Sequence, residues 1–178
     1  KAHISHDTQP NPIEYSGEEK DTIQSPEELN LLSDDEVRRA LNSHAKHILR
    51  NSANQPASTA YQEFLRKYSR AVHQAWHINE DEGSNKFFGY TVVGKIHSGP
   101  FSSVWRLVSD DGVSLALKIM QLDNLRKGPQ IQSFRRGIAS QQLLRDSKSF
   151  DGMAEIVEAF EIPPSVIMEF VEGESLEE

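Results

Sequence analysis

The stretch KIHSGPFSSVW, residues 95–105, decides how the rest of the chain is interpreted. It places a single glycine, Gly99, between two runs with strand-like residues, which is typical of two strands joined by a turn. A phosphate-binding glycine loop and an ordinary β-turn both fit these eleven letters. The residues that follow separate the two interpretations.

The pattern around this stretch has period two, and it predicts a sheet. Strands are expected over residues 90–96, 104–108, 113–120, 155–161 and 166–170, with Asp110, Asp111 and Gly112 as a turn. A helix is expected over 132–145, where apolar residues recur at helical spacing. The order β-β-β-α-β-β predicts an α+β fold, with a five-stranded antiparallel sheet that carries one helix.

In that order, three motifs resemble the small N-terminal lobe of the protein kinase family. Residues 96–104 resemble its glycine-rich loop, although His97 and Ser102 stand where the family usually has its first and third glycines. The segment LALK, which ends at Lys118, resembles the V-A-I-K strand, whose lysine reaches the α- and β-phosphates of ATP. The segment VIMEFVEGESL, residues 166–176, looks like the fifth strand, gatekeeper and hinge, with Met168 as gatekeeper. The resemblance covers residues 88–178, about half of the chain.

The resemblance implies the ATP-binding small lobe of a protein kinase that phosphorylates serine or threonine in a protein substrate. Tyrosine specificity stays open, because the segments that discriminate belong to the other lobe. It implies Lys118 as the catalytic residue, ATP as the nucleotide, and Mg²⁺ only in the full-length parent. The implied nucleotide-binding residues are Ile96, Ser98, Gly99, Phe101, Ser102, Val104, Ala116, Lys118, Met168, Glu169 and Val171.

One departure concerns the helix glutamate that pairs with the lysine in this family. The sequence reads FRRGI over 134–138, so Gly137 occupies the place of the acid. Gln141, one turn later, could offer only a neutral hydrogen bond. A shifted helix in which Asp146 or a more distant acid serves instead is the open alternative.

A second departure is the absence of the H-R-D and D-F-G motifs from the 178 residues. The sequence ends in GESLEE, where the family would begin its C-lobe, and this predicts a piece of a longer protein. Without those acids nothing would hold Mg²⁺ or orient the acceptor hydroxyl, so we expect this piece alone to be inactive. A kinase site lies between two lobes, so we also expect ATP binding to this piece to be weak or undetectable. The alternative function is a pseudokinase scaffold or regulatory protein-interaction module, which the missing glycines and Gly137 favour.

The N-terminal part predicts a different organisation. Residues 1–24 read as an extended or disordered lead-in, 25–78 as a helical hairpin, 79–86 as an acidic linker, 87–171 as the kinase-like lobe, and 172–178 as the start of a link to a missing C-lobe. Ser25 with Glu28 and Ser33 with Glu36 are capping boxes that start helices. The second helix has a broad apolar stripe, so we expect the hairpin to dock on its own lobe or to mediate oligomerisation or partner binding.

Bulk composition excludes several classes of function. The net charge of -8 argues against nucleic acid as the main partner. No apolar run approaches the length of a membrane span, no signal peptide is visible, and the absence of cysteine suits a reducing compartment, so we expect a cytoplasmic protein. Seven histidines invite a metal site, but the pairs His44 with His47 and His73 with His77 are not expected to converge, and we predict no metal site.

Overall fold

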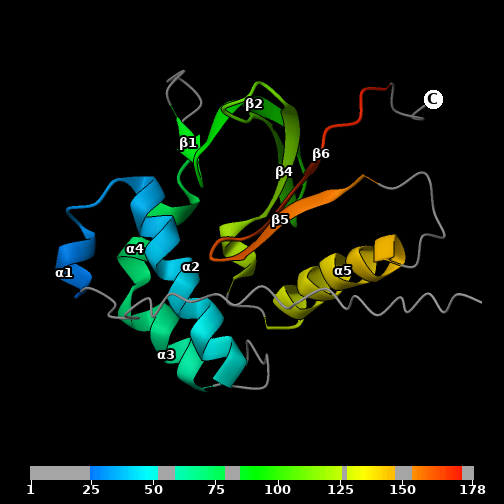
Figure 1. Cartoon of the computed structure of the whole chain (residues 1–178). Helices are drawn as coiled ribbons and strands as arrows, with labels where there is room; N and C mark the ends of the chain where they lie inside the picture. The colour runs from blue at the N-terminus through cyan, green and yellow to red at the C-terminus, as the bar shows by residue number, and fades with distance from the viewer. Residues whose placement is uncertain (1–24, 52–58, 79–84, 126–127, 147–153, 174–178) are drawn as a thin grey trace, which may run out of the picture.

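The computed structural model of the chain describes residues 25–51, 59–78, 85–125, 128–146 and 154–173. Four helices precede a curled sheet, and a fifth helix lies between the fourth and fifth strands in sequence (Figure 1). The expected lead-in over 1–24, most of the acidic linker and the last five residues lie outside the described ranges. Among the described helices, none combines the length and apolarity that a membrane span needs.

The helical part begins where the capping residues predict. Helix α1 spans Pro26–Leu29, and the N–H of Glu28 donates to Ser25 Oγ at 3.3 Å while Ser25 N donates to Glu28 Oε2 at 2.8 Å. Helix α2 spans Asp34–Asn51, and Ser33 and Glu36 form the same reciprocal pair at its start. Each pair satisfies N–H groups that a helix start otherwise leaves without a partner.

The second arm of the hairpin is two helices instead of the one that its stripe predicts. Helix α3 spans Thr59–Lys67 and α4 spans Ser69–Trp76, with Tyr68 between them at φ -104° and ψ 24°. The Tyr68 N–H donates to Phe64 O, and the Val72 N–H donates to Tyr68 O. Helical hydrogen bonds therefore continue across the junction between α3 and α4. No glycine or proline marks the bend, and the Tyr68 ring packs in the core 5.5 Å from that of Phe64.

The sheet confirms the α+β class and the antiparallel pairing, but it has six strands and not five. The strands are β1 (Lys86–Phe87), β2 (Tyr90–Ser98), β3 (Ser102–Val108), β4 (Ser114–Met120), β5 (Ile156–Glu161) and β6 (Pro164–Glu169), in the order β1-β2-β3-β4-β6-β5. The additional strand β1 pairs with β2 through a tight turn in which Phe88 and Gly89 have φ of 51° and 94°. Phe88 is held in this unusual conformation by stacking on Phe160 at 3.7 Å between centroids.

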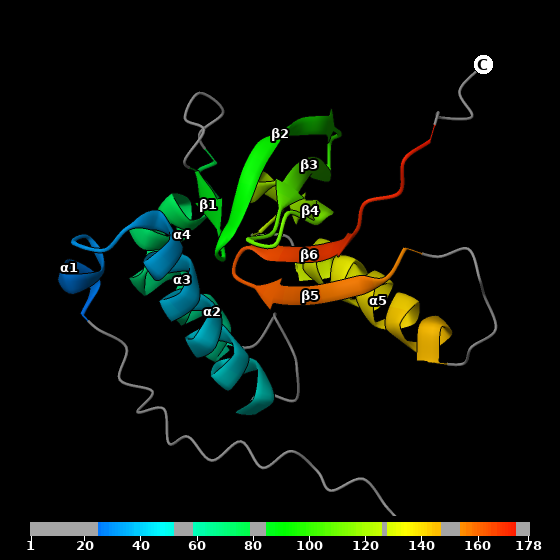
Figure 2. The same cartoon turned by 45° about the horizontal axis from the view of Figure 1, so that its top comes forward.

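The two faces of the sheet differ in burial. On β4, Leu115, Leu117 and Ile119 are buried in one core, whereas Ala116 and Lys118 belong to the other face. Helix α5 (Gly128–Asp146) lies against β5 and β6 (Figure 2), after a short 3₁₀ turn at Leu122–Asn124. This arrangement leaves the Lys118 face open toward α5.

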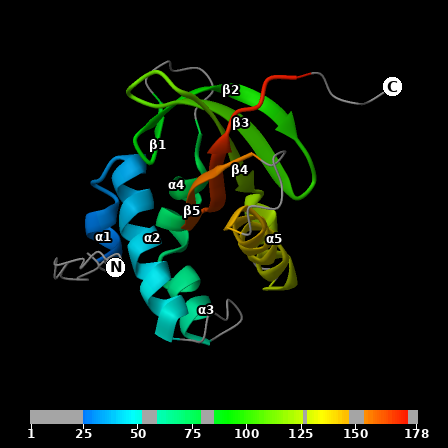
Figure 3. The ribbon, with the colours of Figure 1, turned by 45° about the vertical axis from the view of Figure 1, so that its right-hand side comes forward.

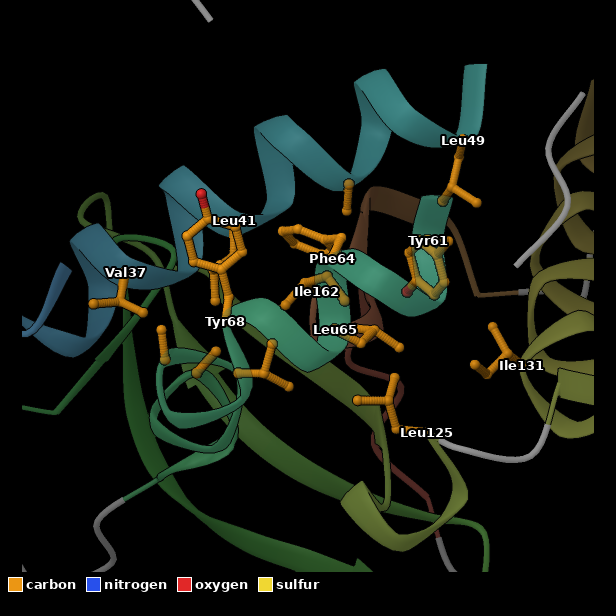
Figure 4. Close-up of a cluster of buried hydrophobic side chains, with 14 of the residues drawn as sticks. Val37, Leu41, Leu49, Tyr61, Phe64, Leu65, Tyr68, Leu125, Ile131 and Ile162 are labelled. Carbon is orange, nitrogen blue, oxygen red and sulfur yellow. The ribbon is translucent and has the colours of Figure 1, made fainter. Parts of the chain in front are cut away.

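The helical hairpin packs on the sheet part of its own chain. Its core includes Met120, Leu125, Ile131 and Ile162 from the sheet part, and Figure 4 shows the last three near Leu65 from α3. Figure 3 shows α2 to α4 and α5 on opposite sides of the β5–β6 hairpin. Side chains of the hairpin and of the sheet part therefore form a common hydrophobic cluster. This cluster covers the broad apolar stripe of α3 and α4.

Hydrogen bonds reinforce this junction, and an ion pair beside it joins β5 to α5. Trp76 Nε1 donates to Met120 O at 2.7 Å. The N–H of Glu161 donates to Asn42 Oδ1 at 2.7 Å, and the Glu161 carboxylate receives Arg135 of α5 through two contacts of 3.0 Å. Glu161 thus links α2 to α5 through its backbone and its side chain.

Candidate functional site

A cavity of about 540 Å³ lies between β4, β6 and α5, at the Lys118 side chain. Strands β4 and β6 contribute Lys118, Val166 and Met168, and the turn before β3 contributes Phe101 and Ser102. Helix α5 closes the opposite side with Phe134, Gly137, Ile138 and Gln141. The volume falls in the range of pockets that hold small-molecule ligands.

Four candidate residues share one face of the sheet because of the strand register. Lys118 pairs with Val104 on one side and with Val166 on the other. Ala116, two residues before Lys118 and so on the same face, pairs with Met168. The face thus carries the apolar side chains of Val104, Ala116 and Met168, the Lys118 ammonium group and, opposite Ala116, the Arg106 guanidinium.

Among the described residues that line the cavity, Lys118 alone is charged. Its side chain is exposed, and the other lining residues are neutral polar or apolar. An ammonium group that faces a cavity without a carboxylate attracts an anionic ligand, since no internal counter-ion competes. The arrangement suits a ligand with one apolar end and one anionic end.

Gly137 lies opposite this lysine face and contributes no side chain to it. A β-carbon built on Gly137 would meet no atom within 4 Å, so the space is open. Gln141 also lines the cavity, but its Nε2 donates to Ala154 O at 2.9 Å, which ties it to the segment before β5. The side chain of Asp146 lies outside the described part of the chain.

The turn at residues 99–102, here called the glycine turn, joins β2 to β3. It is closed by the N–H of Gly99, which donates to Ser102 O at 2.9 Å, with Pro100 and Phe101 at its tip. Gly99 does not adopt a positive φ, and a β-carbon there would lie 3.4 Å from His97 Nε2. The observed conformation therefore does not require glycine at this position.

Of the sequence candidates, only Phe101, Ser102, Lys118 and Met168 are among the described residues that line the cavity, and Gly99, Val104 and Ala116 are not. The other candidates lie elsewhere. Ile96 sits at a register irregularity of β2 and is exposed. Ser98 lines a second cavity of about 200 Å³ with Trp76 and Trp105. After β6, Val171 is 66% exposed, and the Glu169 N–H donates to Glu155 O at 2.8 Å.

Two residues near the site carried no signal in the sequence. Asn124 lines the Lys118 cavity and is 3% exposed, although nothing in its neighbourhood marks it as buried. Arg106, opposite Ala116, places its guanidinium 4.9 Å from the Phe170 ring centroid and donates to Ser114 Oγ at 3.1 Å. The burial of Asn124 and the contacts of Arg106 depend on segments that are far apart in the sequence or on the strand register.

Within the described ranges, no group of three or more His, Asp or Glu side chains is placed to hold a metal ion. Comparison with family models and with curated proteins gave no match to this chain.

Proposed function

We propose that this chain is the ATP-binding small lobe of a protein kinase, with serine or threonine of a protein as the acceptor in the whole protein. The observation that carries the proposal is the position of Lys118. Of the described residues lining the cavity between the glycine turn, β4, β6 and α5, it alone is charged, and the kinase resemblance implies a phosphate-binding lysine at this place.

Each part of the site has a role in this proposal. The Lys118 ammonium binds the α- and β-phosphates through charge-assisted hydrogen bonds. The face of Val104, Ala116 and Met168 takes the adenine ring, because their side chains form a neighbouring apolar surface. No carboxylate that could hold Mg²⁺ is found among the lining residues that the structure describes, so we assign no metal-dependent step to them.

The chain contains neither the acid that would orient an acceptor hydroxyl nor the one that would bind Mg²⁺ in this family. We therefore expect nucleotide binding but no phosphoryl transfer from these 178 residues by themselves. With part of the family's binding site absent, the expected ATP affinity is weak, with a Kd of about 1 mM.

A pseudokinase or regulatory interaction module is the second candidate. The observation that favours it is Gly137, which stands where kinases have the carboxylate that pairs with the lysine and has no side chain to offer. In that case the cavity would have no nucleotide function, and the hairpin and lobe would serve to bind a protein.

The two candidates differ in a ligand titration. We expect millimolar ATP to shift the NMR signals of residues around Lys118, and Lys118→Met to weaken binding about tenfold, because a charge-assisted hydrogen bond is lost. The matched control is Lys67→Met, since Lys67 is also exposed but lies over Tyr68 in the hairpin. Equal ATP affinity in the Lys118→Met protein would refute the role of Lys118, and no binding by the unaltered chain would favour the interaction module.

A further inference from the structure

Three consecutive carbonyl groups of the glycine turn are bound by amide donors from one short segment after β4. Gln121 Nε2 donates to Gly99 O at 3.2 Å, and Asn124 Nδ2 donates to Pro100 O at 3.1 Å. The backbone N–H of Gln121 donates to Phe101 O at 2.9 Å. The tip of the turn is thus bound to the end of the strand that carries Lys118.

Asn124 is the deepest of these donors. It is 3% exposed, and its Nδ2 also lies 3.5 Å from Phe101 O. A buried amide is costly unless its hydrogen bonds are made, so Asn124 favours the bound position of the turn over a detached one. Gln121 is half-buried and adds a longer contact of 3.5 Å to Ser98 Oγ.

The position of the turn matters because the turn forms part of the Lys118 cavity. Phe101 and Ser102 line that cavity together with Asn124 and Lys118. The phenyl ring of Phe101 is 62% exposed, so it lies at the mouth and leaves the cavity accessible. The bound turn is therefore a wall of the cavity, and it does not block it.

We propose that Gln121 and Asn124 are positioning residues that keep the glycine turn fixed as a preformed wall of the Lys118 cavity. A ligand that binds Lys118 then meets an ordered turn and does not lose affinity by ordering it. The inference that the turn is fixed depends only on these hydrogen bonds. The inference that a fixed turn raises the affinity for ATP rests on the function proposed above.

The test compares Asn124→Ala with Asn42→Ala in the whole chain. Asn42 is the matched control, because it is also buried, at 7% exposure, and its side chain also binds a backbone group, far from the turn. Amide hydrogen exchange at Gly99 measures opening of the turn, and an ATP titration by NMR measures affinity. Gln121→Ala receives the same measurements and carries the test if Asn124→Ala does not fold.

We expect Gly99 to exchange at least about tenfold faster in Asn124→Ala and to keep its rate in Asn42→Ala. ATP affinity is expected to fall about three- to tenfold in Asn124→Ala and to be unchanged in the control. Unchanged exchange at Gly99 in both turn variants, or faster exchange with equal or tighter ATP binding, would overturn the proposal. Faster exchange in a chain that binds no ATP would support the fixed turn and overturn the ATP function.

Discussion

The guanidinium of Arg38 lies over the ring of Phe87, 4.8 Å from its centroid, and joins helix α2 to the first strand of the sheet. The Arg38 side chain is fully buried. It donates to Ala75 O at 2.8 Å and Lys86 O at 2.9 Å, and also to His77 O. One cation thus binds carbonyl groups at the end of α4 and at β1, on both sides of residues 79–84.

Replacing Arg38 by methionine is expected to destabilise the chain by about 3 kcal/mol, because carbonyl groups inside the junction lose their donor. The control is Arg39→Met, since Arg39 is 57% exposed and binds Asp35 at 3.1 Å on the surface. A surface ion pair of this kind contributes less than about 1 kcal/mol. Urea unfolding measures both, and similar losses in the two variants would show that the buried contacts of Arg38 are not important.

Gly137→Ala is expected to stabilise the chain by up to about 1 kcal/mol, because alanine is the better helix former and its β-carbon meets no atom within 4 Å. The contrasting variant is Gly112→Ala, where φ is +86° and a side chain is strained despite open space. Opposite shifts of the urea midpoint are expected. Destabilisation by Gly137→Ala would mean that α5 needs a glycine at the cavity.

Removing residues before Ser84 is expected to lower the melting temperature and to promote association. Without the hairpin, Met120, Leu125, Ile131 and Ile162 lose the side chains that cover them. Thermal melting and light scattering of the two proteins measure the effect. If the shortened protein is monomeric and melts at the same temperature, the hairpin is an independent appendage.

Acid sensitivity is expected at the start of α2. Hydrogen bonds from the Ser33 hydroxyl and backbone N–H lower the pKa of Glu36 below its ordinary value of 4.5. A lowered pKa in the folded state stabilises the fold above pH 4.5 and loses that contribution as the pH falls through the folded value. Ser33→Ala should therefore flatten the loss of stability between about pH 5 and pH 3, measured by urea unfolding. Glu36→Gln removes the titrating group, and a steeper loss in either variant would contradict the assignment.

Features that depend on local pattern could be predicted from the amino-acid sequence. The capping residues Ser25 and Ser33 predicted helix starts, because an N-cap needs only residues within one turn. The pattern along 113–120 predicted a strand that carries Lys118, because a period of two is a local property of the sequence, and the structure has this strand as β4 (Ser114–Met120). The antiparallel α+β class followed from the order of such segments.

Contacts between residues that are far apart in the sequence could not be predicted and are seen only in the folded chain. The strand β1 depends on Phe88 stacking on Phe160, and the position of the glycine turn depends on Asn124, and neither contact leaves a periodic trace in the sequence. The lining of the Lys118 cavity is another example. Lys118 and Gly137 line this cavity, whereas Ile96, Glu169 and Val171 do not. Contacts of this kind are set by the packing of α5 and the hairpin on the sheet, and packing energy depends on surfaces that meet across long separations in sequence.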